Sequence, residues 1–329
     1  MQPRRDITRL TKDKIMIKID GLTKHYGRHT VVDELSFDCE PGEVLGFLGP
    51  NGAGKSTTMK MLTGFVTPST GTASICGHDI ETDGLAARQR LGYLPEGAPC
   101  YAEMTPGSFL DFIANIRGMV GKERQSRLEQ VIETLHLEPV LRQTIDTLSK
   151  GFNRRVGLAQ AILHDPDVLI LDEPTDGLDP NQKHEVRDLI RSMSADKLIV
   201  ISTHILEEVE ALCSRAIIIA DGKVLADDTP HALAMRSRYH NAVRLTVGSE
   251  TSFDEVASSV AKLESVEATE SDREHGDVTA IARSDSKDMQ TWNEVINLVK
   301  DKQWNIERLQ LEAGRLDEVF RQITKGAAA

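Results

Sequence analysis

The chain has 329 residues, of which 40% are hydrophobic and 27% are charged, and its formal net charge is −12. This is the composition of an ordinary globular protein, long enough for a large core and two domains. The acidic balance argues against a nucleic-acid partner, because non-specific nucleic-acid binding needs a basic surface.

The start of the chain carries no targeting signal that we can identify. Residues 1–14 are polar and charged, and we expect a frayed N-terminal arm without the apolar core of a signal peptide. No apolar run approaches the roughly 18 residues that a membrane span needs. The scattered cysteines argue against a zinc site or a disulfide framework, and they favour a reducing compartment; they are Cys39, Cys76, Cys100 and Cys213.

The first elements that the hydrophobic pattern predicts are strands. Alternating isoleucines predict a half-buried strand over residues 15–20, and a second strand is expected over 31–38. Residues 43–48 form a short apolar run, which is typical of a buried strand.

A glycine-rich segment follows this third strand and precedes a predicted helix. In that context the Gly-x4-Gly-Lys-Ser pattern predicts a loop that wraps its N–H groups around the phosphates of a nucleoside triphosphate. Lys55 should reach the β- and γ-phosphates, and the Ser56 hydroxyl should bind Mg²⁺. The expected binding residues are Gly49, Pro50, Asn51, Gly52, Ala53, Gly54, Lys55, Ser56 and Thr57.

Another predicted strand, far downstream of the glycine-rich segment, ends in two acidic residues. Residues 168–171 are four consecutive apolar residues, followed by Asp172 and Glu173. Acidic residues at the carboxyl end of a buried parallel strand lie where open α/β sheets bind ligands. Asp172 can hold Mg²⁺ and Glu173 can orient an attacking water, whereas a plain acidic turn is the simpler alternative.

Four further residues are candidates for nucleotide binding only in combination with the other motifs of the chain. Tyr26 could stack on an adenine face, although a lone loop tyrosine is more often plain surface or core. Ser149 and Gly151 open a predicted helix, where a simple Ser cap is the alternative. His204 follows the strand over residues 198–201 and would ordinarily be a hydrogen-bonded structural residue.

Taken in this order, these segments resemble the nucleotide-binding subunit of ATP-binding-cassette (ABC) transporters over roughly residues 15–235. The resemblance implies an α/β fold of the P-loop NTPase type, an ABC cassette. Such a cassette has a RecA-like mixed sheet core, an antiparallel β subdomain and a helical subdomain, here at about residues 97–160. It also implies the roles of the site residues: Tyr26 would stack on adenine, Asp172 would bind Mg²⁺, Glu173 would be the catalytic carboxylate and His204 would sense the γ-phosphate.

The resemblance extends to contacts with a second cassette. Ser149 and Gly151 would form the signature loop that completes the site of the opposite subunit, and Asp179 would link the two sites. This sequence departs from the family pattern at Lys150 and Phe152, where the usual residues are Gly and Gln. Because Ser149 and Gly151 are retained, we still expect activity.

Another departure is Glu96, which stands where most relatives carry Gln. A carboxylate can still bind Mg²⁺ or its water, and its charge would retune the site. The segment around Glu96 and the Ser-Lys-Gly signature look like the ATPase subunits of type-2 ABC exporters, whose relatives serve gliding motility, copper-site maturation, and drug or sodium efflux.

The pattern of hydrophobic residues changes after a polar linker over residues 227–240. Strand-like and helical patterns alternate in βαββαβ order, which resembles a small α+β ferredoxin-like domain over residues 240–329. Fold alone implies no function for it. Every predicted nucleotide contact precedes this domain, so we expect an accessory or regulatory role.

The sequence therefore predicts an ATPase that dimerises around two Mg·ATP, as a homodimer, and powers a separate membrane permease, in export. It would lie in the cytoplasm, on the inner face of the membrane through that permease. A P-loop kinase is disfavoured, because a kinase has no use for the signature and His204. A non-transport ABC ATPase acting on ribosomes or nucleic acid, or a catalytically weak nucleotide-binding module, is the alternative.

Overall fold

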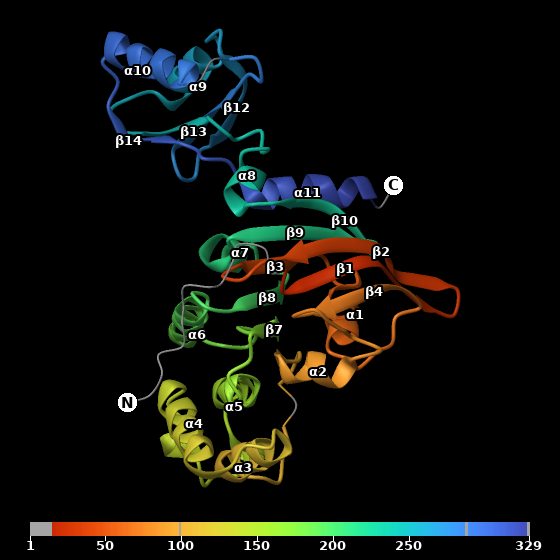
Figure 1. Cartoon of the computed structure of the whole chain (residues 1–329). Helices are drawn as coiled ribbons and strands as arrows, with labels where there is room; N and C mark the ends of the chain where they lie inside the picture. The colour runs from red at the N-terminus through yellow and green to blue at the C-terminus, as the bar shows by residue number, and fades with distance from the viewer. Residues whose placement is uncertain (1–14, 99, 287–288, 328–329) are drawn as a thin grey trace, which may run out of the picture. The chain divides into compact units, whose positions relative to one another are not determined.

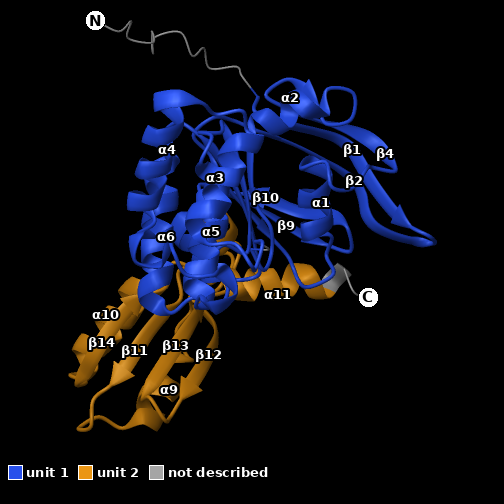
Figure 2. Cartoon of the chain, turned by 90° about the horizontal axis from the view of Figure 1, so that it is seen from below, with its two compact units in different colours: residues 1–228, 327–329 blue, residues 229–326 orange. Residues whose placement is uncertain are grey.

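The computed structural model describes residues 15–98, 100–286 and 289–327, so the predicted arm over residues 1–14 lies outside the described residues. The chain divides into two compact units (Figure 2). The first comprises residues 1–228 with 327–329, and the second comprises residues 229–326.

The first unit is built on a six-stranded mixed sheet with the strand order β10-β9-β3-β8-β7-β6 (Figure 1). Its strands are β3 (Val44–Leu48), β6 (Leu91–Leu94), β7 (Val168–Asp172), β8 (Leu198–Thr203), β9 (Arg215–Ala220) and β10 (Lys223–Asp228). All neighbours are parallel except β9 and β10. Every residue of β3, β7 and β8 is buried, which explains their unbroken apolar runs. Their carboxyl ends consequently meet at one edge.

An antiparallel sheet packs on the same core. Its strands are β1 (Ile17–Tyr26), β2 (His29–Cys39), β4 (Thr70–Ile75) and β5 (His78–Asp79), in the order β2-β1-β4-β5. Helix α1 (Lys55–Leu62) contacts strands of both sheets, and its Met59, Met61 and Leu62 are buried in the core that the sheets share. The short α2 (Gly84–Gln89) connects β5 to β6.

Helices form the rest of the first unit. Figure 1 shows α3 (Pro106–Ile116), α4 (Gly121–Thr134) and α5 (Lys150–Ile162) gathered at one end of the first unit. The short turns η2 (Glu138–Val140) and η3 (Ile145–Thr147) lie between α4 and α5 in the sequence. Leu110, Val131 and Leu158 belong to their common core. Helices α6 (Pro180–Met193) and α7 (Leu206–Leu212) follow β7 and β8. The predicted cassette architecture of mixed sheet, antiparallel subdomain and helical subdomain is confirmed.

The second unit holds a four-stranded antiparallel sheet in the order β12-β13-β11-β14. In chain order the elements are β11 (Val243–Val247), α9 (Phe253–Val260), β12 (Val266–Asp272), β13 (Asp277–Ala282), α10 (Gln290–Lys302) and β14 (Ile306–Leu311). This βαββαβ arrangement is the predicted ferredoxin-like one. Its core includes Val243, Leu245, Val256, Val278 and Val295. Helix α11 (Leu316–Ala327) ends the described chain.

The boundary between the units lies at Asp228, earlier than the residue 235 that we expected. Helix α8 (Pro230–Ala234) begins just after it and belongs to the second unit. A Cβ atom on Gly314 would come within 2.1 Å of the Ala234 carbonyl oxygen, so the two main chains are in contact. The Arg315 guanidinium lies 3.7 Å from the ring centroid of Tyr239. The stretch that resembled a linker is therefore packed structure.

Candidate functional site

A cavity of about 340 Å³ lies where β3 gives way to α1. Most of the residues that line it come from the glycine-rich loop and the start of α1, and Val31, Glu96, Glu173 and His204 complete it. The loop backbone requires glycine at Gly54, whose φ is +101° and where a Cβ atom would lie 2.6 Å from the Val31 carbonyl oxygen. The structure thus brings the predicted loop, Glu96, Glu173 and His204 to one cavity.

Lys55 is the buried cation of this cavity, with only 6% of its surface exposed. Its Nζ donates hydrogen bonds to the carbonyl oxygens of Gly49 (2.7 Å) and Pro50 (3.1 Å). Burial lowers the pKa of Lys55, and the carboxylates of Glu173 and Asp172 oppose that shift. A cation held this way at a helix N-terminus favours an anionic ligand.

Asp172 and Ser56 fit a magnesium ion. Asp172 is 1% exposed, and neither of its carboxylate oxygens has a hydrogen-bond partner among the described residues. Burial raises the pKa of Asp172, and the nearby hydroxyls of Ser202 and Ser56 partly offset the shift. Buried, unpaired carboxylate oxygens beside a hydroxyl are a donor set suited to a hard cation.

Protein side chains alone do not complete such a site. Within the described ranges, no group of three or more His, Cys, Asp or Glu side chains could hold a metal ion.

Glu173 and His204 form a pair at the ends of β7 and β8. His204 Nδ1 lies 2.8 Å from a carboxylate oxygen of Glu173. The Glu173 side chain is 16% exposed and that of His204 is 47% exposed. Glu173 has a φ of +50°, a left-handed conformation that costs a non-glycine residue about 1–3 kcal/mol. The surrounding structure must hold this residue in place.

The remaining predicted residues lie outside this cavity. Tyr26 is exposed at the end of β1, with Lys24 Nζ 5.3 Å from its ring centroid. The Ser149 hydroxyl accepts from Phe152 N (3.3 Å) at the start of α5, and an Asp179 carboxylate oxygen accepts from Gln182 N (3.0 Å) at the start of α6. A Cβ atom on Gly151 would lie 2.3 Å from Gln182 Oε1. Ser149, Gly151 and Asp179 thus gather at two neighbouring helix N-termini.

Two buried charged residues near the site were missed by the sequence reasoning. Arg154 is 5% exposed and Glu208 is 1% exposed. The Glu208 carboxylate accepts from Thr203 Oγ1 (2.9 Å) and from the Thr175 hydroxyl, so it ties the segment before His204 to the segment after Glu173. Arg154 directly follows the signature, where Asn153-Arg154 replaces the more usual Gln-Arg or Arg-Gln, and that departure by itself implied no role. Glu208 belongs to no motif, and a charged residue ordinarily indicates a solvated face.

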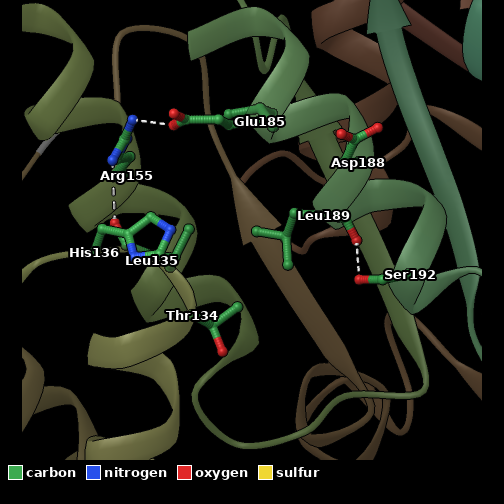
Figure 3. Close-up of a pocket in the computed structure, with 9 residues that line it drawn as sticks. Thr134, Leu135, His136, Arg155, Glu185, Asp188, Leu189 and Ser192 are labelled. Carbon is green, nitrogen blue, oxygen red and sulfur yellow. Dashed lines mark hydrogen bonds and ion pairs between the residues drawn. The ribbon is translucent and has the colours of Figure 1, made fainter. Parts of the chain in front are cut away.

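A second cavity of about 340 Å³ lies between α4, α5 and α6 and contains none of the predicted site residues. Figure 3 shows Arg155 of α5 directed toward Glu185 of α6, with which it forms an ion pair. Arg155 Nη1 also donates to the Leu135 carbonyl oxygen at 3.5 Å. Arg155 and Glu185 are thus satisfied by contacts outside the phosphate-loop cavity.

Among the helices of the described residues, none combines the length and the apolar character that crossing a bilayer requires.

The geometry of the first cavity defines a class of protein. The central parallel strand β3 leads into a glycine-rich loop and a helix, a buried acid ends β7 on the far side of β8, and a carboxylate–imidazole pair lines the same cavity as the loop. This is the site of a P-loop nucleoside triphosphatase.

Comparison with known proteins identifies the family. The family model described as ABC transporter matches residues 32–176. The Nod factor export ATP-binding protein I of Paraburkholderia xenovorans is 41% identical over 218 residues, covering 66% of this chain and 72% of that protein. The protein of the same name from Ralstonia nicotianae is 38% identical over 219 residues, covering 66% of this chain and 68% of that protein.

Solved structures agree with these relatives. The structure of an ATP-binding subunit of an ABC transporter aligns with a TM-score of 0.63 at 31% identity, over 67% of this chain and 92% of that one. A dimeric ATP-binding cassette in a post-hydrolysis state with ADP and Pi shares the fold. Its TM-score is 0.60 at 23% identity, and the alignment covers 65% of this chain and 99% of that one. The chain belongs to the ABC transporter family, as an ATP-binding subunit that hydrolyses ATP.

Proposed function

We propose that this chain works as one of two identical cassettes that close around two Mg·ATP and drive a separate membrane permease, on whose cytoplasmic side they lie. We propose export as the direction, because the relatives with the matching cassette are export ATP-binding proteins. The observation that carries the proposal is the pair of Glu173 and His204 at the cavity that Lys55 and its loop line.

The geometry supports the following roles within one cassette. Lys55 and the loop N–H groups bind the phosphates, and Ser56 and Asp172 hold Mg²⁺, with Glu96 at the same cavity. When bound, the ion supplies charge stabilisation to the phosphoryl group. Glu173 accepts a proton from the attacking water and His204 orients the Glu173 carboxylate.

The remaining roles are assigned to predicted residues that lie outside the phosphate-loop cavity. Ser149 and Gly151 lie at the N-terminus of α5, where backbone N–H groups and the helix dipole favour an anion. We assign them to the γ-phosphate held by the opposite cassette, with Asp179 at the adjoining α6 N-terminus linking the two sites. Tyr26, exposed at the end of β1, is assigned to the adenine face.

The test is Glu173→Gln in the full chain. Turnover should fall by at least about a hundredfold, because the general base is lost. ATP affinity should be retained, and ATP with Mg²⁺ should trap a dimer that size-exclusion chromatography resolves. Glu185→Gln, the same substitution at the second cavity, is the control and should leave turnover unchanged.

Undiminished turnover in Glu173→Gln would remove the proposed role of Glu173. A monomer in ATP and Mg²⁺, at concentrations where the wild-type chain dimerises, would contradict the closing dimer. A nucleotide-binding module without chemistry would show no turnover in the wild-type chain either.

A further inference from the structure

Arg154 is a buried cation beside the site, and it bonds to main chain rather than to an acid. It lies in the second turn of α5, after the segment that begins at Ser149. Within the described chain, its guanidinium donates to the carbonyl oxygens of Pro174 (Nε, 3.3 Å), Pro95 (Nη1, 3.3 Å) and Asp172 (Nη2, 3.2 Å). Nη2 also donates to the carbonyl oxygen of Glu173.

These carbonyls come from two segments that are distant in the sequence. Pro95 directly precedes Glu96, and the other three carbonyls surround and include Glu173. Both Glu96 and Glu173 line the cavity that holds the phosphate loop. One guanidinium therefore joins the backbones of two cavity carboxylates and attaches both to helix α5.

The bond to the Glu173 carbonyl bears on the unusual backbone there. Glu173 lies in the left-handed region with a φ of +50°. On one side of this residue, Glu173 N donates to the Ser202 carbonyl oxygen at 2.9 Å. On the other side, its carbonyl accepts from Arg154 and from Asp176 N at 3.2 Å. Arg154 thus holds the conformation that directs the Glu173 side chain to His204.

Only arginine has the donors for this task. Its planar guanidinium carries five N–H donors in a rigid fork, whereas a lysine ammonium is a point donor that cannot reach carbonyls on separate sides. Burial lowers the pKa of Arg154, and the carboxylate of Asp176 opposes this shift. Arginine nonetheless stays charged, and the carbonyl dipoles take the place of water around it.

We propose that Arg154 is a positioning residue for ATP hydrolysis: it holds the Glu173 and Glu96 segments in register with each other and with the α5 helix that carries the signature residues. The inference rests on the proposed catalytic role of Glu173. Arg154 itself touches neither nucleotide nor water in this scheme, so its loss should change kcat far more than ATP affinity.

The test uses Arg154→Gln and Arg154→Lys in the full chain. We expect kcat to fall by about tenfold to a hundredfold in Arg154→Gln, since small misplacements of a catalytic group have effects of this size. The Kd for a fluorescent ATP analogue should change by less than about threefold, because the phosphate loop is not altered. Arg154→Lys should fold and show an intermediate kcat, and it serves if Arg154→Gln does not fold.

Arg155→Gln is the matched control, because Arg155 neighbours Arg154 on α5 but pairs with Glu185 at the second cavity. Its kcat should stay within about twofold of the wild type, because Arg155 and Glu185 line the second cavity and not the one that holds the phosphate loop. Equal losses in both arginine variants would mean a general effect on α5 and would overturn the proposal. Wild-type kcat in Arg154→Lys, and in Arg154→Gln if it folds, would overturn it as well.

A double variant separates this inference from the one it rests on. If Arg154 acts through Glu173, adding Arg154→Gln to Glu173→Gln, or Arg154→Lys where Arg154→Gln does not fold, should lower kcat by less than about twofold more. Additive losses would overturn the positioning role while leaving Glu173 catalytic. Full turnover in Glu173→Gln alone would instead remove the proposed catalytic role of Glu173.

Discussion

The imidazole Nδ1 of His204 lies 2.8 Å from the carboxylate of Glu173 and joins the ends of two neighbouring parallel strands. Asp172 on β7 is in register with Ser202 on β8. Glu173 and His204, which follow the ends of these strands, therefore lie at the same edge of the sheet. The hydrogen bond requires an N–H on Nδ1 of His204. The neutral tautomer that is protonated at Nδ1 provides it, and so does the imidazolium. His204 thereby restrains the side chain of the proposed general base.

His204→Ala should therefore lower kcat by about tenfold to a hundredfold, because the Glu173 carboxylate loses its orienting donor. ATP affinity should change little, since Lys55 and the loop N–H groups are untouched. Steady-state turnover and equilibrium binding of a fluorescent ATP analogue measure the two quantities. His184→Ala removes an exposed histidine that pairs with Asp188 on α6, and it should behave as wild type. Equal turnover in the two variants would contradict the orienting role.

Shared sites predict complementation between two inactive chains. Ser149→Arg blocks the signature helix and Lys55→Ala disables the phosphate loop, and the structure places these residues in different parts of the cassette. A mixed dimer would hold one intact site. With random pairing and independent sites, an equimolar mixture should recover up to about a quarter of wild-type turnover.

The complementation experiment requires each chain to be inactive alone. Full activity of Ser149→Arg by itself would mean that Ser149 does not serve a γ-phosphate. A mixture that forms dimers but recovers no turnover would contradict sites that are shared and independent.

Segments with local sequence signals were predictable before the structure. The strand over 43–48, the glycine-rich loop and α1 are contiguous, so a pattern of a few residues specifies them together. The same holds for β7 with Asp172 and Glu173 at its end, because a buried parallel strand needs an unbroken apolar run.

The contacts of Arg154 could not be predicted in this way. Its partners are main-chain carbonyls of residues such as Pro95 and Pro174, which leave no trace in side-chain identity. The boundary at Asp228 was missed for a related reason. Thr229 and Pro230 are helix-start residues as well as linker residues, and tertiary packing of α8 decides between the two.

We expect His164 to make the stability of the cassette depend on pH. Its Nε2 lies 3.0 Å from the Leu91 carbonyl oxygen, and its buried Nδ1 has no partner among the described residues. Burial, with the charge of Arg117 nearby, lowers the pKa of His164 to about 4 from 6.5. Below pH 6.5 the unfolded chain takes up a proton that the folded chain does not. The stability present above pH 6.5 is therefore lost as pH falls toward 4, by up to about 1.4 kcal/mol per pH unit.

His164→Gln should remove this part of the acid sensitivity, because the amide can still donate to Leu91 and does not titrate. Urea unfolding at pH 7, 6 and 5 measures the free energy of unfolding of both chains. The advantage of the wild-type chain over the variant should shrink with each step down in pH. A constant difference across this range would show that His164 keeps its ordinary pKa in the folded protein.

We propose that the second unit is a separable accessory domain. Every residue that lines the phosphate-loop cavity precedes Asp228, and the second unit has its own buried core of residues such as Val243, Leu245 and Val278. A chain ending at Asp228 should stay folded and bind ATP with an affinity within about threefold of the full chain, since each unit is compact by itself. Residues 229–326 alone should unfold cooperatively.

A chain ending at Arg238 is the informative control, because it keeps α8 but removes Gly314 and Arg315, which contact Ala234 and Tyr239. It exposes apolar surface such as Leu233 and should aggregate more than the shorter chain. Loss of ATP binding in the chain ending at Asp228 would show that the cassette depends on the second unit.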